Sequence, residues 1–250
     1  MLDNNKNKTI LITRPKGDES LLKDELTRRN YKIIHEPLTE IILKHDSRME
    51  VEHFLFKDPN AVLITSSHGA KSLSLLTDIR DMFLLCVGDN TANTAKQLGF
   101  SNVTATGENV DHMIDYVMDC YDENSEFLYI SGEHTSADLE NIFSVRGMSV
   151  KRIITYEAVA VDEISDTTKE QLKRGNINVV TFFSKRAAEI FLTLIEKNEL
   201  SAILRETDAF CLSENIAGII ERYKWKTVNI SKQATLKSLL DSIDESYNKL

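Results

Sequence analysis

The sequence predicts an α/β protein with two similar lobes, because the chain repeats itself and because short apolar runs alternate with helix-like segments. Three pieces of the first half recur in the same order in the second half. They are Ile10–Ile41, Val62–Leu76 and Leu84–Val117, and their counterparts are Phe127–Val161, Val179–Ile195 and Ala209–Ile243. Two similar lobes imply a cleft between them, and small-molecule chemistry is usually carried out in clefts.

Nine short runs are predicted to be strands, and most are continuously apolar, as expected for strands covered by helices on both faces. They are Ile10–Thr13, Ile33–His35, Val62–Thr65, Leu84–Val87, Val103–Thr106, Phe127–Ile130, Val179–Phe183, Phe210–Leu212 and Val228–Ile230. The segments between them have apolar residues at helical spacing, such as Ala188, Phe191, Leu192 and Ile195. Strands alternating with helices predict doubly wound parallel sheets with right-handed crossovers.

The repeat alone leaves two ways of building the lobes. The chain could divide simply into Met1–Asn124 and Ser125–Leu250, or its two ends could build one lobe and its middle the other. The runs Glu36–Leu43 and Thr155–Ile164 occupy equivalent places, and each extends the preceding strand. Both could leave their lobes and pair as a two-stranded bridge, which would form a hinge from equivalent parts of each repeat.

Composition narrows the class of protein. The formal net charge is −9 and the basic residues are dispersed, which argues against a nucleic-acid surface. We find neither an apolar run near the roughly 20 residues that cross a bilayer nor the apolar stretch of a signal peptide at the polar start. Cys86, Cys120 and Cys211 form no CxxC pair, and two of them lie in apolar runs typical of buried thiols. We therefore expect a cytoplasmic monomer without membrane or nucleic-acid partners.

Small and hydroxylated residues follow most of the predicted strands. They are Thr13-Arg14, Thr65-Ser66-Ser67, Gly88-Asp89-Asn90-Thr91, Thr106-Gly107, Ser131-Gly132, Ser184 and Ser213. In open parallel sheets, ligands collect beyond the carboxyl ends of strands, where free backbone N–H groups and helix dipoles hold anions. Ser, Thr, Asn and Asp are also ordinary helix caps, so capping is the alternative interpretation at each position.

The usual cofactor and catalytic motifs are missing. The sequence has no GxGxxG, GxxxxGK[ST], HExxH or GxSxG, and its six histidines are dispersed, which is typical of surface or cap residues. We expect neither a cofactor nor a metal. An enzyme of this kind would act mainly by holding a reactive substrate in one shape.

Seven motifs, taken in order, resemble the uroporphyrinogen-III synthase family. They are ILITRP with PLTEI, ITSSHGAKSL, CVGDNTANTAKQLGF, SGEHTSADL, ITYEAVAV, FFSKRAAEIF and CLSENIAGII, and they cover the chain from Ile10 to about Ile243. The resemblance implies a lyase of haem and tetrapyrrole biosynthesis. This enzyme cyclises hydroxymethylbilane to uroporphyrinogen III without a cofactor, inverting the last pyrrole ring and losing water. It also implies transient contacts with neighbouring enzymes of the pathway.

For architecture, the resemblance implies the interleaved arrangement of two flavodoxin-like parallel-sheet domains joined by a two-stranded β-ladder hinge. One domain would comprise residues 1–35 and 166–250, and the other residues 44–154. Residues 36–43 and 155–165 would be the connecting strands.

The resemblance also implies roles for individual residues. Tyr156 matches the family tyrosine that faces the cleft and assists departure of the hydroxyl, although packing at the domain junction is the alternative. Ser66, Thr91, Gly132 and Ser184 match family cleft positions, and Arg14 of the TRP motif could neutralise a substrate carboxylate or form a local salt bridge. With the other strand-end residues, the expected substrate-binding set is Arg14, Thr65, Ser66, Thr91, Gly107, Ser131, Gly132, Ser184 and Ser213.

Two stretches depart from the family pattern. Ser213-Glu214-Asn215 replaces a glycine-proline-threonine stretch, and His68 stands where other members carry Asn or Arg.

Two rival functions share the predicted fold. One is a non-catalytic, two-lobed cytoplasmic binding protein for an anionic metabolite, and the other is a flavin-binding flavodoxin-like protein, for which the sequence lacks aromatic residues flanking a phosphate loop.

Overall fold

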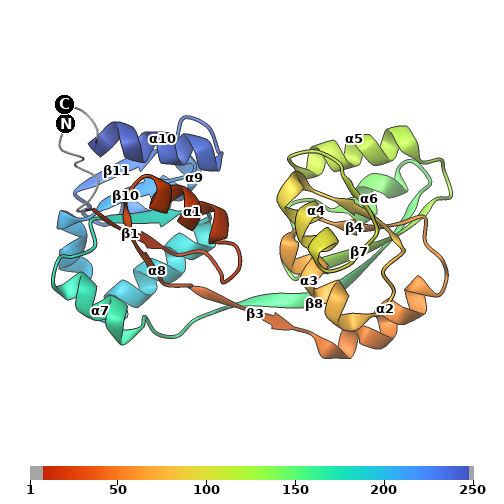
Figure 1. The fold of residues 1–250 in the computed structure, drawn as a ribbon, viewed down its shortest axis with the longest axis horizontal. Coiled ribbons are helices and arrows are strands. Elements are labelled where there is room, and N and C mark those ends of the chain that lie inside the picture. The colour runs from red at the N-terminus through yellow and green to blue at the C-terminus, as the bar shows by residue number, and fades with distance from the viewer. Residues whose placement is uncertain (1–7, 248–250) are drawn as a thin grey trace. The chain divides into compact units, whose positions relative to one another are not determined.

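The computed structural model describes residues 8–247, which form two compact units with one sheet each. Unit 1 comprises Met1–Glu40 and Val159–Leu250, and unit 2 comprises Ile41–Ala158. The chain runs from unit 1 into unit 2 and back again, so unit 1 contains both the first and the last of the described residues (Figure 1).

Unit 1 has a five-stranded sheet in the order β11-β10-β9-β1-β2, and all four strand pairs are parallel. Its strands are β1 (Thr9–Ile12), β2 (Lys32–His35), β9 (Val179–Phe182), β10 (Asp208–Cys211) and β11 (Thr227–Ile230). Its helices are α1 (Ser20–Arg28), α7 (Asp166–Lys173), α8 (Lys185–Lys197), η3 (Ser201–Glu206), α9 (Glu214–Ile220) and α10 (Leu236–Tyr247).

The strands of unit 1 are buried on both faces, which explains why they are continuously apolar. Ile10 and Ile12 of β1 pack into one cluster with α1 and α10, whereas Leu11 between them packs into another cluster with α7, α8 and α9. All three side chains are fully buried. Successive side chains of a strand point to opposite faces, so helices must cover both sides of this sheet.

Unit 2 has a six-stranded sheet in the order β3-β8-β7-β4-β5-β6, in which the pairs from β8 to β6 are parallel. Its strands are β3 (Thr39–Leu43), β4 (Ala61–Ile64), β5 (Phe83–Cys86), β6 (Asn102–Ala105), β7 (Glu126–Gly132) and β8 (Ser149–Ala160). Its helices are η2 (His45–Ser47), α2 (Arg48–Leu55), α3 (Ser67–Leu76), α4 (Gly88–Gln97), α5 (Val110–Cys120) and α6 (Leu139–Ser144).

The two sheets share one strand order, although each is assembled from both sequence repeats. Unit 1 reads β2-β1-β9-β10-β11, and unit 2, without β3, reads β8-β7-β4-β5-β6. In the repeat, β7 and β8 are the counterparts of β1 and β2, and β9 to β11 are those of β4 to β6. Each sheet therefore combines the first two strands of one repeat with the last three of the other.

The segments that connect the units differ in detail from the expected continuous extensions. On the amino-terminal side, residues 36–38 interrupt the strand between β2 and β3, because Pro37 has no N–H for a ladder bond and Glu36 binds Ser165 instead. On the return, β8 is one strand through Ala160, and residues 161–165 lie outside it. Hydrogen bonds from Lys44 N to Thr155 O (2.8 Å) and from Val161 N to Leu38 O (3.0 Å) run in antiparallel register.

Most predicted strands begin and end about one residue earlier than expected. Thr13 lies just beyond β1, where its hydroxyl donates to the carbonyl of Thr181 at 2.9 Å, and Thr106 lies beyond β6 and donates to Cys86 O at 3.2 Å. These hydroxyls bond to carbonyls at the ends of neighbouring strands.

Cys86 and Cys211 are buried as expected, and burial raises the pKa of each thiol to about 12. Within residues 8–247, no helix is long and apolar enough to cross a membrane.

Candidate active site

The largest cluster of predicted site residues in unit 2 lies at the carboxyl ends of β4 and β7, two neighbouring strands. β4 ends at Ile64 and is followed by Thr65 and Ser66, and β7 ends with Ser131 and Gly132. β8 pairs with the other edge of β7 and brings Tyr156 beside Gly132. Segments that are far apart in sequence thus deliver Ser66, Gly132 and Tyr156 to one place.

The hydroxyl of Tyr156 lies 2.8 Å from the Ser66 hydroxyl, and either oxygen can donate in this hydrogen bond. The Tyr156 ring lies directly against Gly132. A Cβ added to Gly132 would come within 2.7 Å of Tyr156 Cε2 and 3.1 Å of its hydroxyl oxygen, so the ring occupies the space that any other residue would fill. The phenol is therefore held at its oxygen and along one side of its ring.

An irregularity in the β7–β8 ladder explains how Tyr156 reaches this position. Ser131 pairs with Ile154, but Gly132 pairs with Tyr156, so Thr155 is an extra residue on β8. Such a bulge redirects side chains and often occurs beside active sites. Thr155 is fully buried, and its hydroxyl lies 2.7 Å from that of Ser72 in α3. This contact anchors the bulge to α3, the helix that Ser66 caps.

Arg152 of β8 fixes the conformation of the chain that follows β7. Its Nε donates to the hydroxyl of Ser131 at 2.9 Å, and its Nη2 donates to the carbonyls of Gly132 and Glu133 at 2.9 and 2.7 Å. Ser131 is 1% exposed, so its hydroxyl serves this internal contact. The guanidinium thereby fixes the backbone of Gly132, against which the Tyr156 ring packs.

A second tyrosine, Tyr129 of β7, contacts this cluster through Thr65. It is buried, and its hydroxyl lies 3.0 Å from the Thr65 hydroxyl. Burial, and to a lesser degree the neighbouring Tyr156, raise the pKa of Tyr129, although the Thr65 hydrogen bond opposes the shift. Tyr129 is therefore a neutral hydroxyl at physiological pH. The side chains of Thr65 and Ser66, both predicted ligands, each have a tyrosine hydroxyl as a partner.

Three residues of this neighbourhood were not predicted from the sequence. Tyr129 and Arg152 have their partners far away in sequence, and no spacing could reveal them. His68 contradicts the expectation that the histidines lie at the surface or cap helices, because it is only 9% exposed, in the first turn of α3. Its ring centre lies 6.0 Å from that of Tyr156. The available signals were its position in ITSSHGAKSL, near the capping Ser66, and its departure from the Asn or Arg of other family members.

Thr91 and Gly107 lie farther along the same edge of the unit 2 sheet. Thr91 is 5% exposed within α4, which follows β5. Gly107 has a φ of +128°, and a Cβ there would lie 2.4 Å from that of His112, so both conformation and space require glycine. The Gly107 carbonyl accepts from Gly88 N at 2.7 Å, which joins the turns after β5 and β6.

The remaining predicted ligands, Arg14, Ser184 and Ser213, belong to unit 1. The guanidinium carbon of Arg14 lies 4.8 Å from the centre of the Phe183 ring, a cation–π contact, and the Arg14 carbonyl is 2.8 Å from His35 Nε2. Ser184 caps α8 by accepting from Ala187 N at 3.1 Å. Ser213 stands at the N-cap of α9 with no side-chain capping bond. Its hydroxyl thus does not play the capping role expected as an alternative.

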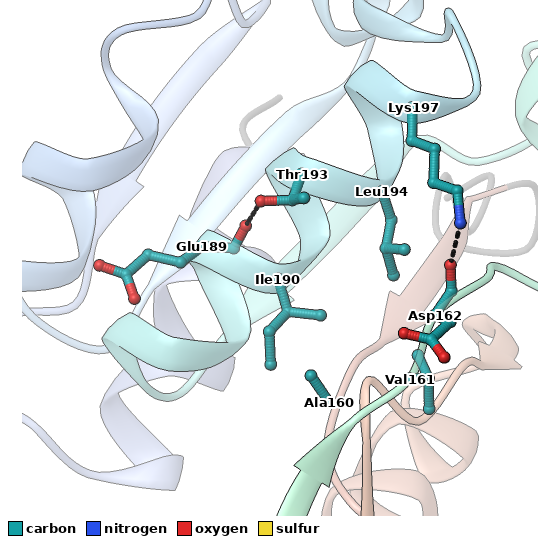
Figure 2. A pocket seen from close by; sticks show the side chains of 8 residues that line it. All are labelled: Ala160, Val161, Asp162, Glu189, Ile190, Thr193, Leu194 and Lys197. Carbon is teal, nitrogen blue, oxygen red and sulfur yellow. Dashed lines mark hydrogen bonds between the residues drawn. The ribbon is translucent and has the colours of Figure 1, made fainter.

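A pocket of about 410 Å³ lies elsewhere in unit 1, between α8 and the segment that follows β8 (Figure 2). Its lining contains Ile190, Leu194 and Val161 but none of the predicted site residues. Two of the polar side chains seen there bind the protein itself (Figure 2). Lys197 Nζ donates to the carbonyl of Asp162 at 2.8 Å, and the Thr193 hydroxyl donates to that of Glu189 at 3.0 Å.

Comparison with known proteins decides the family. The family model described as "Uroporphyrinogen-III synthase HemD" matches residues 20–241. The chain belongs to the uroporphyrinogen-III synthase family. The match spans the whole cluster around Tyr156, together with Ser184 and Ser213, whereas Arg14 lies before it.

A curated relative of this chain shares less than a quarter of its residues. The chain is 22% identical over 247 residues to the "Porphyrin biosynthesis protein HemD" of Ruminiclostridium josui, a match that covers 94% of this chain and 48% of that protein. The chain therefore spans about half the length of this curated relative.

Solved structures of family members share the fold. The structure titled uroporphyrinogen-III synthetase from Helicobacter pylori matches with a TM-score of 0.60 and 17% identity, over 96% of this chain and 99% of that one. A mutant uroporphyrinogen III synthase from Thermus thermophilus matches with a TM-score of 0.52 and 15% identity, over 97% and 100%. These similarities confirm an α/β fold dominated by parallel sheets.

Proposed function

We propose that this chain is a uroporphyrinogen-III synthase, which closes linear hydroxymethylbilane into uroporphyrinogen III. The single observation that supports this most strongly is the family match over residues 20–241. In the reaction, the terminal hydroxyl departs and takes up a proton to become water. The substituted carbon of the last pyrrole ring then attacks, and the resulting spiro intermediate rearranges, so that this ring is inverted in the product. Loss of a proton as the pyrrole re-forms balances the proton that the hydroxyl took up.

Tyr156 is the proposed proton donor for the departing hydroxyl. A phenol is protonated at neutral pH and can donate a hydrogen bond. Its ring is held by Gly132 and its oxygen by Ser66 at 2.8 Å, so the group is already positioned before a substrate arrives. A fixed donor of this kind assists a leaving group without reorganisation at the moment of reaction.

The substrate carries eight carboxylates, and the chain has a formal net charge of −9. Local donors must therefore outweigh an unfavourable overall field. We propose that the carboxylates bind to backbone N–H groups at strand ends and helix amino termini, with Arg14 as a cationic contact. These places are marked by Ser66, Thr91, Gly107, Gly132, Ser184 and Ser213. Thr65 and Ser131, which directly precede Ser66 and Gly132, support two of them.

The finer architecture belongs to the same proposal. Residues 1–35 with 166–250 would be one flavodoxin-like domain and residues 44–154 the other. The hydrogen bonds that join β3 to β8 support a two-stranded connection that acts as a hinge. We also propose that the enzyme works as a cytoplasmic monomer, with transient contacts to neighbouring pathway enzymes; the free thiols of its cysteines suit a reducing compartment.

The test uses freshly generated hydroxymethylbilane, which closes unaided to the symmetric type I isomer. The full chain is added, the products are oxidised to porphyrins, and the two isomers are separated by chromatography. We expect predominantly the type III isomer, formed faster than the spontaneous background. Tight binding of hydroxymethylbilane without type III product would instead favour the non-catalytic binding protein.

A further inference from the structure

We propose that Ser66 is a positioning residue for Tyr156: its hydroxyl donates a hydrogen bond to the phenol oxygen, so that the phenol can direct its own proton toward a substrate. This inference rests on the proposed role of Tyr156 in the reaction. It changes the role expected of Ser66 from a substrate ligand to a residue that acts through the tyrosine.

The other partner of Ser66 leaves its proton available for the proposed hydrogen bond to Tyr156. Ser66 is the N-cap of α3, and its Oγ accepts from Gly69 N at 3.2 Å. A backbone N–H can only donate, so Ser66 acts as an acceptor on that side. A serine hydroxyl has one proton and two lone pairs, so its proton can be donated to the Tyr156 oxygen, 2.8 Å away. In the proposed arrangement, donors run from Gly69 N–H through Ser66 to Tyr156.

The position of this series of hydrogen bonds makes the Tyr156 hydroxyl a stronger donor. Successive hydrogen bonds polarise one another, and the series begins at the positive end of the dipole of α3, a helix of 10 residues. Each link makes the next hydroxyl a better donor. A Tyr156 phenol that accepts from Ser66 is therefore a stronger donor toward a departing hydroxyl than an isolated tyrosine.

The protein contains a matched control for the capping role. Ser184 caps α8 with almost the same backbone geometry, φ −149° and ψ 153° against −151° and 156° for Ser66, and it accepts from Ala187 N at 3.1 Å. In the repeat, the two serines occupy equivalent places. Ser184→Ala thus measures what a lost cap costs in the free energy of unfolding, without any effect on Tyr156.

The experiment measures kcat and KM for type III formation, and the free energy of unfolding, for three replacements of Ser66. Ser66→Ala removes both the cap and the donor, Ser66→Thr keeps both, and Ser66→Asp keeps a strong cap but can only accept. Each is made alone and together with Tyr156→Phe. Kinetics at saturating substrate separate kcat from any repulsion between Asp and the substrate carboxylates.

We expect Ser66→Ala to lower kcat by roughly 2- to 12-fold, the factor that one neutral hydrogen bond is worth, with KM unchanged. Ser66→Thr should restore the parent kcat. Ser66→Asp should have a kcat no higher than that of Ser66→Ala, although its stability is retained. The reason is that the carboxylate accepts a hydrogen bond from the phenol and so directs the phenol proton away from the substrate. In the Tyr156→Phe background, Ser66→Ala should lower kcat no further, and it should lose about as much stability as Ser184→Ala.

The inference alone would be overturned by a parental kcat for Ser66→Asp, or by losses from Ser66→Ala and Tyr156→Phe that multiply in the double variant. Either would show that Ser66 acts independently of the phenol proton. If the unmodified chain formed no type III product, the proposed function would fail, and the inference with it. A slow Tyr156→Phe beside a normal Ser66→Ala would leave the proposed function standing and refute only the role of Ser66.

Discussion

Glu36 accepts a hydrogen bond from the backbone N–H of Ser165 at 2.9 Å, and this contact ties the segment that leads into β3 to the segment that follows β8. The Glu36 side chain is buried, and its other oxygen accepts from the hydroxyls of Ser165 and Thr168. Ser165 is also the N-cap of α7, whose positive end favours the carboxylate. A single buried carboxylate thus joins, within unit 1, the segments that adjoin the two places where the chain passes between the units.

Replacing Glu36 by Ala should destabilise the protein by about 1–3 kcal/mol, because the N–H of Ser165 and two hydroxyls, one of them on the buried Thr168, lose their acceptor. Chemical denaturation monitored by far-UV circular dichroism measures the effect. Asp241→Asn, on the exposed side of α10, is the control and should change stability by less than about 0.5 kcal/mol. Equal small effects from both variants would show that the Glu36 contacts contribute nothing to the fold.

Asp208 should make stability depend on pH in the acid range. Burial would raise the pKa of its carboxyl, but hydrogen bonds from Tyr247, Lys226 and Thr227 outweigh burial and lower it below the ordinary value near 3.8. A pKa lowered by folding means that the contribution is complete above about pH 4 and is lost as the pH falls through the folded-state pKa. Denaturation of the parent chain and Asp208→Asn should therefore show a stability gap at neutral pH that narrows in acid, below the ordinary pKa of the carboxyl. A gap of constant size would contradict the assignment.

Gly132→Ala should impair the reaction far more than the fold. The new Cβ would meet the movable Tyr156 ring rather than backbone, so the ring shifts and its bond to Ser66 is lost. We expect kcat to fall about 10- to 100-fold, as for loss of the phenol itself. The double variant with Tyr156→Phe should be no slower than Tyr156→Phe.

Gly218→Ala is the matched control for this substitution. Gly218 lies in α9, and nothing lies within 4 Å of an added Cβ, so the change should leave kcat unchanged and stabilise the helix by up to about 1 kcal/mol. Comparable kcat values for Gly132→Ala and the parent chain would show that the ring tolerates displacement and that its position does not matter.

The strands could be predicted well because they are buried on both faces, and a run such as Ile10–Thr13 is too continuously apolar to lie at the surface. The repeat alone could not predict the division of the chain into units, since β1 finds its partner β9 nearly 170 residues away, across the repeats. The repeat described equivalent strands, not the sheet that each one joins. Among the residues themselves, Glu36–Leu43 and Thr155–Ile164, the segments that connect the units, raised the interleaved option, and the family resemblance implied it.

The residues that gather at the candidate site could be predicted in part, for similar reasons. Ser66 and Gly132 could be recognised because they follow apolar runs at the carboxyl end of a parallel strand. Tyr129 resembles a core residue within its run, and Arg152 resembles an exposed base on an edge strand. Their roles depend on Thr65 and Ser131, contacts 64 and 21 residues apart that only the folded sheet brings together.

The most direct test of the proposed mechanism compares the parent chain with Tyr156→Phe on freshly generated hydroxymethylbilane, with rate and isomer measured in the same samples. We predict type III product from both, with the variant slower by about 10- to 100-fold, because the phenol assists departure of the hydroxyl while other contacts fold the substrate. A parental rate for Tyr156→Phe would make Tyr156 a packing residue. Type I product at the parental rate would make it a determinant of substrate shape, and type I product at the spontaneous rate from the parent chain itself would contradict the mechanism altogether.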